Sequence, residues 1–255
     1  MLTSDVNIGN ESGKEWADKI ITELKSMPNV VVKNRAQVFG YYDHNMLVMS
    51  ERLTEHLPKS DKFTPKQKLW YIRAKEVVIS SGSIERPLVF GNNDTPGVLL
   101  SSAAKEYMKV YGVLVGKKPI IFTNNDSAYE TAIEFKKNGV DPIVLDSRKE
   151  LSSDLINEAK SLGINIKFEY VVVNANGYRK VKSADIAKIS DDKTTLGKIE
   201  NIACDCICVS GFWTPTIHLA SQSGGKTKFN EEIDAFIPSK SKPVSYTHLR
   251  AHETH

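Results

Sequence analysis

The chain has 255 residues, of which 40% are hydrophobic and 25% charged, as is usual for a globular protein. Its 34 basic and 31 acidic residues are too evenly balanced to favour nucleic acid or a membrane surface as a partner. No apolar run approaches the roughly 20 residues that cross a bilayer, the N-terminus lacks a signal pattern, and 3 cysteines are too few for a disulfide framework. These features predict a cytoplasmic protein.

The first third of the chain is predicted to form a helix followed by antiparallel strands. Trp16, Ile20 and Leu24 recur at helical spacing before Pro28, which would stop a helix. The strands are recognised by β-branched and aromatic runs between turn residues. The predicted elements are a helix through residues 16–24, strands at 30–32, 36–42 and 46–50, a polar loop at 57–67, and a strand or strand pair at 70–79.

Residues 77–97, with the sequence VVISSGSIERPLVFGNNDTPG, are the most informative stretch. A β-branched run is followed by a turn of small residues that includes Ser81 and Gly82. A buried strand that ends in a glycine-containing turn lets a ligand approach the backbone, and ligands of open α/β sheets bind beyond the carboxyl ends of the strands. A plain strand-to-loop corner is the alternative, since glycine marks turns of every kind. The stretch suggests a dinucleotide fold although the chain has no GxGxxG.

A βαβ unit follows at residues 119–146. Asp146 ends its second strand, 23 positions after Thr123, where the acid of a nucleotide-binding unit hydrogen-bonds the ribose hydroxyls. The turn between them has no glycine, so its side chains would hold a pyrophosphate away from the backbone amides. The alternative is therefore a Rossmann-like unit that binds nothing tightly. The candidate cofactor-binding residues of the turn are Thr123, Asn124, Asn125 and Asp126.

The other elements of this part follow from the same patterns. We expect helices at 101–111, 128–135 and 151–162, a strand at 164–173, a hairpin turn at 174–177, an antiparallel meander at 181–202 and a strand at 202–210. Ser101 or Ser102 is the expected N-cap of the first helix.

Three cysteines in the last strand alternate, which predicts that they lie on one buried face. Metal binding or dithiol chemistry is disfavoured because there is no CxxC, and we expect no metal site. Two histidines, His44 and His218, occupy turn and helix-start positions that suit any polar residue. No convincing acid, base or nucleophile stands out, so the catalytic residues are unknown. The cysteines are Cys204, Cys206 and Cys208.

The segment CDCICVSGFWTP repeats the earlier pattern of an apolar strand that ends in Ser-Gly, here with Gly211, and a proline four or five residues on. Two such strand ends on either side of a βαβ unit form a pattern that resembles one in flavoproteins of the disulfide-reductase type. In those proteins the pattern occurs where the chain leaves and re-enters its first nucleotide-binding domain. The stretches VFGYYDHN (38–45), LWYIRAKEVVISSGSIERPLVFGNNDTPGVLLSSAA (69–104), FTNNDSAYETA (122–132) and CDCICVSGFWTPTIHLASQSGGK (204–226) closely resemble the alpha subunit of heterotetrameric sarcosine oxidase. Related opine-oxidase and cyanide-synthase-type subunits fit less well.

The resemblance implies oxidative demethylation of sarcosine to glycine, with peroxide formed from oxygen and one carbon passed to tetrahydrofolate. It implies that the alpha subunit binds a dinucleotide, NAD or FAD, and belongs to a hetero-oligomer with a flavin-bearing beta subunit, FMN at the interface, and smaller subunits. It places Ser81, Gly82 and Gly211 at the strand ends near the dinucleotide. The substrate would be a small molecule.

The chain also departs from the family. The family's strand-GxGxxG-helix unit and its folate-binding region are not in this sequence, so we expect a fragment that is inactive by itself. Ser80-Ser81-Gly82 stands where the family has Ala-Thr-Gly, and Gly211-Phe212-Trp213 where it has Gly-Gly-Trp. The end of the chain, VSYTHLRAHETH, fits nothing in the family and is expected to be non-native or disordered.

The predicted fold is an α/β, FAD/NAD(P)-binding disulfide-reductase-like fold with a truncated first Rossmann domain and an inserted second Rossmann-like domain. Residues 1–112 and 204–238 are the expected partial first domain, 113–203 the inserted domain and 239–255 the tail. The main hypothesis is a sarcosine oxidase alpha-subunit fragment that contributes dinucleotide binding and the interface to the beta subunit. The alternatives are a non-catalytic scaffold with a degenerate nucleotide fold, or an NAD(P)-dependent flavoprotein reductase.

Overall fold

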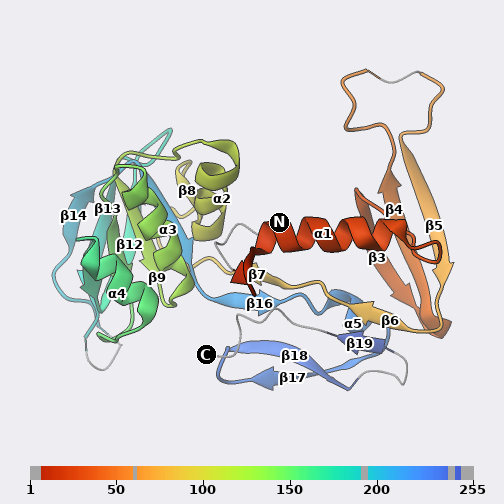
Figure 1. The fold of residues 1–255 in the computed structure, drawn as a ribbon. Coiled ribbons are helices and arrows are strands. Elements are labelled where there is room, and N and C mark those ends of the chain that lie inside the picture. The colour runs from red at the N-terminus through yellow and green to blue at the C-terminus, as the bar shows by residue number, and fades with distance from the viewer. Residues whose placement is uncertain (1–6, 60–61, 191–194, 241–244, 248–255) are drawn as a thin grey trace. The chain divides into compact units, whose positions relative to one another are not determined.

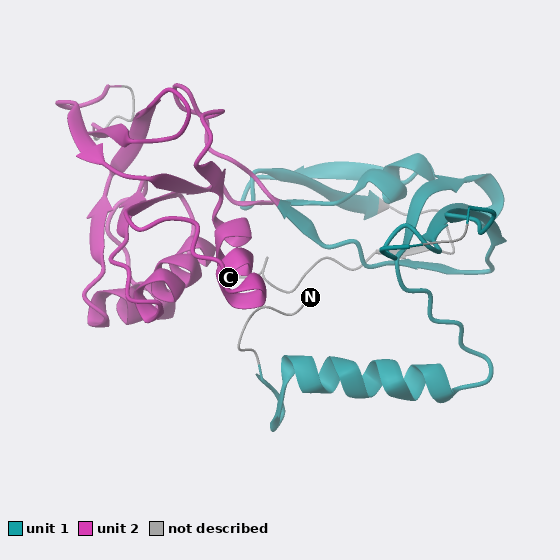
Figure 2. Cartoon of the chain, turned by 90° about the horizontal axis from the view of Figure 1, so that it is seen from above, with its two compact units in different colours: residues 1–84, 214–255 teal, residues 85–213 magenta. Residues whose placement is uncertain are grey.

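The computed structural model describes residues 7–59, 62–190, 195–240 and 245–247 (Figure 1). The chain forms two compact units: unit 1 comprises residues 1–84 and 214–255, and unit 2 comprises residues 85–213 (Figure 2). These divisions fall at other positions than the expected domain boundaries after residues 112 and 203. The assignment of dinucleotide-binding domains stays a prediction.

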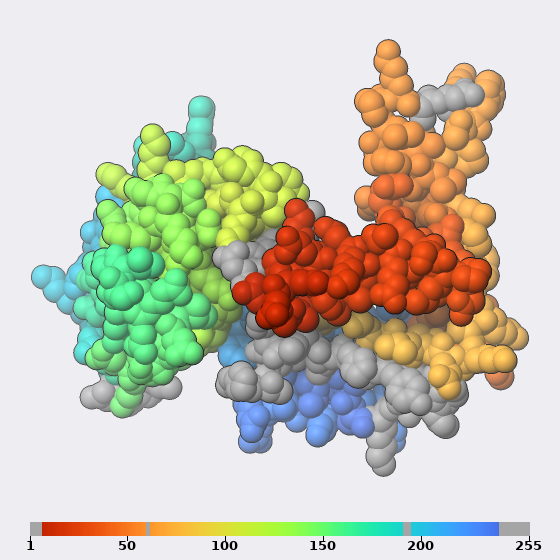
Figure 3. Space-filling view, viewed as in Figure 1, coloured from red at the N-terminus to blue at the C-terminus, as the bar shows by residue number. Residues whose placement is uncertain are grey.

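The described part of unit 1 begins with two short antiparallel strands, β1 (Asn7–Ile8) and β2 (Glu11–Ser12). The predicted helix, α1 (Gly13–Ser26), follows them in the sequence. Ser12 caps the helix: its Oγ accepts from the Glu15 amide at 3.3 Å, and the Glu15 carboxylate accepts from the Ser12 amide at 3.2 Å. This reciprocal capping box satisfies two donors at the helix start. In the space-filling view α1 lies open along the visible face of unit 1 (Figure 3).

A three-stranded antiparallel sheet follows in unit 1, made of β3 (Ala36–Tyr42), β4 (Met46–Arg52) and β5 (Gln67–Arg73). The short 3-10 turn η1 (Asp43–Asn45) joins β3 to β4, with His44 at φ 58°. The expected strand at residues 30–32 was wrong, because these residues pair with no strand and Arg35, at φ 54°, separates them from β3. A β-branched run forms a strand only where a partner is present.

The rest of unit 1 is built from short elements. The core under the antiparallel sheet joins Tyr41, Val77, Ile79 and Ala220. Residues 239–240 end β18 and residues 245–247 form β19, which pairs with β6, while 241–244 and 248–255 of the expected tail lie outside the described residues. The elements are β6 (Val77–Ile79), α5 (His218–Gln222), β17 (Lys226–Asn230), β18 (Ala235–Lys240) and β19 (Ser245–Thr247), with β7 (Ser83–Glu85) paired to β16 (Trp213–Pro215) where the chain passes between the units.

Unit 2 contains a five-stranded sheet in which every pairing is parallel, as the βαβ pattern predicts. The strand order is β11-β10-β9-β15-β8, so β15, late in the sequence, is inserted between β9 and β8. The strands are β8 (Val98–Leu100), β9 (Pro119–Thr123), β10 (Ile143–Asp146), β11 (Asn165–Phe168) and β15 (Cys206–Ser210).

The two faces of this sheet are covered differently (Figure 1). The first face packs on three helices, and the second packs on a three-stranded antiparallel meander. The residues of β15 alternate between them: Cys206 and Cys208 face the helices, and Ile207 and Val209 face the meander. The covering elements are α2 (Ser101–Tyr111), α3 (Ser127–Lys137) and α4 (Asp154–Ser161), and β12 (Tyr170–Asn176), β13 (Ser183–Lys188) and β14 (Glu200–Ala203).

Three local expectations for unit 2 need correction. The strand expected at 202–210 is two strands, and Cys204 lies between them in the meander cluster, so the three cysteines do not share one face. The break is made by Asp205, whose carboxylate accepts from the amides of residues 117 and 118 at 2.8 Å. The strand expected at 164–173 is divided at Glu169, which has φ 61°.

The third correction concerns the N-cap of α2. Leu100 occupies the cap position and forms no side-chain cap bond. The buried carboxylate of Glu85 takes that role, accepting from the Ser102 amide at 2.9 Å and from its Oγ at 2.6 Å. A carboxylate at a helix N-terminus is stabilised by the helix dipole. A residue distant in sequence thus does what the local pattern assigned to a serine.

Candidate functional site

The carboxyl ends of three neighbouring strands in unit 2 carry most of the predicted site residues. Asp146 of β10 pairs with Thr123 of β9, and Thr123 pairs with Ser210 of β15. This is the edge at which ligands of open α/β sheets bind. The fold therefore brings Thr123, Asn124, Asn125, Asp126, Asp146 and Gly211 to one sheet edge, whereas Ser81 and Gly82 lie in unit 1.

Three backbone amides in and next to the turn after β9 already have partners. The Asn125 amide donates to Thr123 Oγ1 at 3.0 Å, and the Asn124 amide donates to the Ser210 carbonyl at 3.3 Å. The Ser127 amide, at the start of α3, donates to Asn125 Oδ1 at 3.1 Å. A phosphate bound at a helix N-terminus needs such amides free. Here they stabilise the turn itself.

The side chain of Asn125 fills the space in which a dinucleotide-binding turn has glycine. It is 5% exposed, and its Nδ2 donates to the Ser210 carbonyl at 3.2 Å and to Ser210 Oγ at 3.0 Å. Its Oδ1 accepts from Ser127 Oγ at 2.6 Å, and Ser127 Oγ accepts from Trp213 Nε1 at 2.9 Å. One buried amide therefore joins β9, α3 and the end of β15.

The candidate ribose acid, Asp146, is fully buried and covered by two side chains. Arg148 donates to it through Nε at 3.0 Å and Nη2 at 2.8 Å, and the Tyr129 hydroxyl donates at 2.8 Å. Arg148 Nη2 also donates to Asp126 at 2.7 Å. Burial, assisted by the negative charge of Asp146, raises the pKa of Tyr129 far above its ordinary value of 10.0, so the hydroxyl remains a donor.

A dinucleotide does not fit this edge of unit 2 as it stands. The amides of Asn124, Asn125 and Ser127 already donate to protein oxygens, and the acid that would meet the ribose is shielded by Arg148 and Tyr129. A buried carboxylate that lost its arginine partner would be an uncompensated charge, which is costly. The side chains at this sheet edge form hydrogen bonds with one another and one buried ion pair, between Asp146 and Arg148.

Several members of this network were absent from the sequence prediction: Tyr129, Arg148, Ser210 and Trp213. Only Arg148 had a local signal, since it stands two residues after Asp146 and can reach back to the strand end. The others meet the turn through the sheet pairing and the start of α3. Sequence spacing alone does not reveal such contacts.

Gly211 has a packing role in unit 2. Its amide donates to the Arg86 carbonyl at 2.6 Å, and Arg86 Nε donates to the Gly211 carbonyl at 3.2 Å. A Cβ at this position would meet the carbonyl oxygens of Arg86 and Pro87 at 3.0 Å. Glycine is therefore needed for the close approach of these two chain segments. Its role beside a dinucleotide stays a prediction.

Ser81 and Gly82 follow β6 in unit 1. Gly82 has φ 68°, a left-handed conformation that favours glycine. Its carbonyl accepts from the Thr216 amide at 2.9 Å, and Ser81 Oγ donates to the Thr216 carbonyl at 2.7 Å. The turn is thus held against the segment that leads into α5, while Ser81 remains exposed.

Other expected features concern metals and membranes. The residues that the structure describes contain no cluster of three or more His, Cys, Asp or Glu side chains that could hold a metal ion. Within the same residues, no helix has the length and apolarity that a membrane crossing requires. Burial raises the pKa of Cys204 to about 12, which makes its thiol unreactive.

The architecture defines the class. Solved structures with this fold include thioredoxin reductase from T. acidophilum, with a TM-score of 0.66 at 14% identity over 96% of this chain and 74% of that chain. L-proline dehydrogenase from P. horikoshii has a TM-score of 0.61 at 20% identity over 96% of this chain and 41% of that chain. Bacillithiol disulfide reductase from Staphylococcus aureus has a TM-score of 0.63 at 15% identity over 96% of this chain and 71% of that chain. The predicted FAD/NAD(P)-binding disulfide-reductase-like fold is confirmed.

Sequence similarity is more specific. The chain is 34% identical over 238 residues to sarcosine oxidase subunit alpha of Rhizobium meliloti (strain 1021), covering 93% of this chain and 23% of the relative. It is 33% identical over 245 residues to the same subunit of Corynebacterium sp. (strain P-1), covering 95% and 25%. No protein-family model matches. The predicted resemblance to sarcosine oxidase alpha subunits is confirmed, and the chain spans about a quarter of the length of these relatives.

Proposed function

We propose that this chain is part of the alpha subunit of a flavoprotein oxidoreductase of the sarcosine oxidase type. The supporting observation is the identity of about one third with sarcosine oxidase alpha subunits, which extends over 93% of this chain and so over both units. The whole enzyme would demethylate sarcosine oxidatively to glycine, with peroxide formed from oxygen and one carbon passed to tetrahydrofolate. It would act on a CH–NH bond, and this chain alone would be inactive.

The proposal includes a dinucleotide, NAD or FAD, near Ser81 and Gly82 of unit 1. The left-handed backbone of Gly82, in the turn after β6, supports a close approach of a ligand there. FMN would lie where the chain meets a beta subunit, and smaller subunits would complete the complex. A cytoplasmic location is supported by three buried free cysteines.

The second candidate is a scaffold whose nucleotide fold is degenerate. It is favoured by the turn that Asn125 fills and by the buried pair of Asp146 and Arg148. In this case unit 2 would serve the complex through packing, and the cofactor contacts would come from other parts of the subunit.

Calorimetric titration of the chain with NAD and with FAD separates these candidates. We expect no tight binding at the edge of unit 2. If either dinucleotide binds, Gly82→Ala should weaken it and Asn125→Ala should leave it unchanged. Tight binding that depends on Asn125 and Asp146 would contradict the scaffold candidate.

The activity itself is tested by a chimera. The matching quarter of the Rhizobium meliloti alpha subunit is replaced by this chain, and sarcosine-dependent oxygen uptake is measured together with the beta subunit. We expect activity within tenfold of the unaltered complex. A complex that assembles and binds its flavins but does not oxidise sarcosine would contradict the proposed substrate.

A further inference from the structure

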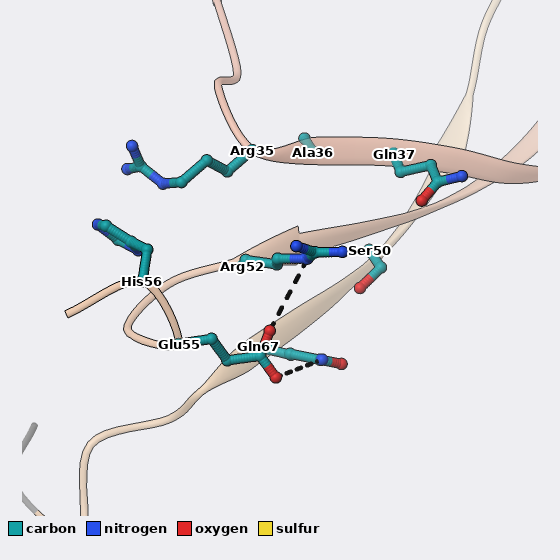
Figure 4. A pocket seen from close by; sticks show the side chains of 8 residues that line it. All are labelled: Arg35, Ala36, Gln37, Ser50, Arg52, Glu55, His56 and Gln67. Carbon is teal, nitrogen blue, oxygen red and sulfur yellow. Dashed lines mark hydrogen bonds and ion pairs between the residues drawn. The ribbon is translucent and has the colours of Figure 1, made fainter. Parts of the chain in front are cut away.

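A groove in unit 1 gathers polar and charged side chains, none of which belongs to the turns after β6 and β9 (Figure 4). It encloses about 410 Å³ and lies at the open ends of β3, β4 and β5. Its lining includes Arg35, Gln37, Ser50, Arg52, Glu55 and His56.

The register of the antiparallel sheet explains why these side chains meet. Gln37 of β3 pairs with Ser50 of β4, and Arg52 of β4 pairs with Gln67 of β5. Since alternate residues of a strand share a face, Ser50 and Arg52 lie on the same face as their partners. The sheet therefore presents one polar strip across three strands.

Arg35 is held at the rim of the groove by an unusual backbone. Its φ is 54°, in the left-handed region that non-glycine residues rarely occupy. Its carbonyl accepts from the Arg52 amide at 3.0 Å, so the two arginines are tied together by the backbone. Among the described residues the Arg35 guanidinium has no partner. Backbone strain of this kind often accompanies a functional site.

The turn after β4 supplies the other wall. It is anchored to the start of β5, because the Leu53 amide donates to the Lys66 carbonyl at 2.8 Å and Thr54 Oγ1 donates to the Pro65 carbonyl at 3.2 Å. His56 stands on this turn, and it extends to the same side as Arg35 (Figure 4).

The single carboxylate of the groove is already engaged. Glu55 accepts from Gln67 Nε2 at 2.7 Å and lies 3.8 Å from Arg52 Nε. It therefore orients Arg52 without neutralising Arg35. The remaining donors fall into two groups in Figure 4: Arg35 and His56 extend to one side of the groove, and Gln37, Ser50 and the Arg52 guanidinium lie toward the other.

We propose that this groove binds an oxyanion of the phosphate class, either free phosphate or the phosphate group of a small phosphomonoester. Guanidinium groups match the oxygen geometry of phosphate and form charge-assisted hydrogen bonds with it. Arg35 and His56 extend to the same side of the groove and can donate to different oxygens of one tetrahedral anion. The site is independent of the proposed enzyme function.

Calorimetry on the full chain at constant ionic strength in chloride tests the site, with inorganic phosphate, glycerol 2-phosphate and acetate as probes. We expect both phosphate probes to bind and acetate to bind at least roughly tenfold more weakly. Equal affinity for the two phosphate probes would indicate free phosphate, and tighter binding of glycerol 2-phosphate would indicate a phosphomonoester.

Arg35→Gly removes the guanidinium and tolerates the left-handed backbone, so it should fold and weaken phosphate binding roughly tenfold. His56→Gln should weaken it as well and replaces the first variant if that one unfolds. Arg73→Gln, an exposed arginine further along β5, is the matched control and should bind as the parent chain does. Absence of phosphate binding, equal binding of acetate, or unchanged binding by both groove variants would overturn the proposal.

Discussion

The turn after β6 in unit 1 and the turn after β9 in unit 2 follow the same kind of strand, but they are completed differently. Gly82 in the first turn uses a left-handed backbone and pairs with the segment at Thr216. In the second turn the buried side chain of Asn125 occupies the space, and Asp146 beside it is covered by Arg148. A strand that ends in a turn of small polar residues therefore does not define a nucleotide site. The side chains that fill the turn decide whether a ligand can enter.

The same contrast extends to the charged groups of the two units. Unit 2 buries a carboxylate completely and surrounds it with donors, whereas the corresponding interactions of unit 1 lie nearer the surface. Changes in unit 2 should therefore have larger effects on stability than changes in unit 1. The following predictions, from the largest effect to the smallest, test that difference.

Arg148→Ala should lower the free energy of unfolding of unit 2 by about 3 kcal/mol, because it leaves the charge of Asp146 buried without its partner. The loss can be measured by amide hydrogen exchange in β9 and β10. Arg179→Ala, an exposed arginine in the same unit, is the control and should change stability by less than about 0.5 kcal/mol. An equal loss of stability in the two variants would contradict the view that Arg148 compensates the buried charge of Asp146.

Asn125→Ala should cost about 2 kcal/mol, because Ser210 and the amide of Ser127 lose a buried partner. Urea unfolding gives this value. The neighbouring Asn124→Ala removes one acceptor at 3.3 Å and should cost less than about 1 kcal/mol. If Asn124 proved the more important of the two, the turn would be stabilised in another way than its contacts indicate.

Gly82→Ala should destabilise unit 1 by about 1 kcal/mol, since alanine is strained at a φ of 68°. Gly82→Asn should cost less, because asparagine tolerates the left-handed region. Hydrogen exchange in β6 provides the measurement. An alanine variant as stable as the parent, with the asparagine variant less stable, would show that the backbone conformation is not the reason for glycine.

The smallest effect concerns a half-buried carboxylate in unit 1, Glu51. The Trp70 Nε1 hydrogen bond to Glu51, at 2.7 Å, together with Lys33, lowers the pKa of Glu51 below its usual 4.5. Because the folded pKa is the lower one, this contribution to stability is present above pH 4.5 and is lost as the pH falls through the folded pKa.

Trp70→Phe removes the donor, so the pKa of Glu51 should rise toward 4.5 and the acid-dependent loss of stability should become smaller. Carboxyl NMR titration measures this change. Asp185 of unit 2, whose pKa is lowered mainly by its hydrogen bond from Asn201, is an internal control that should not move. An unchanged pKa of Glu51 would show that the indole is not the main cause.

The sequence by itself determined the elements that depend on near neighbours. The helix before Pro28, the strand pair around His44 and the βαβ pattern ending at Asp146 are set by interactions over a few residues and by hydrophobic period, so they could be predicted. The edge that collects the candidate site residues also followed, because parallel strands align their carboxyl ends.

Only the tertiary structure decided what those residues do. Glu85 caps α2 from outside the helix, and Tyr129 and Arg148 cover Asp146. The close approach of the Arg86 carbonyl is the reason for glycine at position 211. These contacts join side chains from different helices and strands, so the spacing of residues within one element does not predict them. Whether a turn is open to a ligand or filled by its own side chains is settled by the burial and hydrogen bonding of groups far apart in the chain.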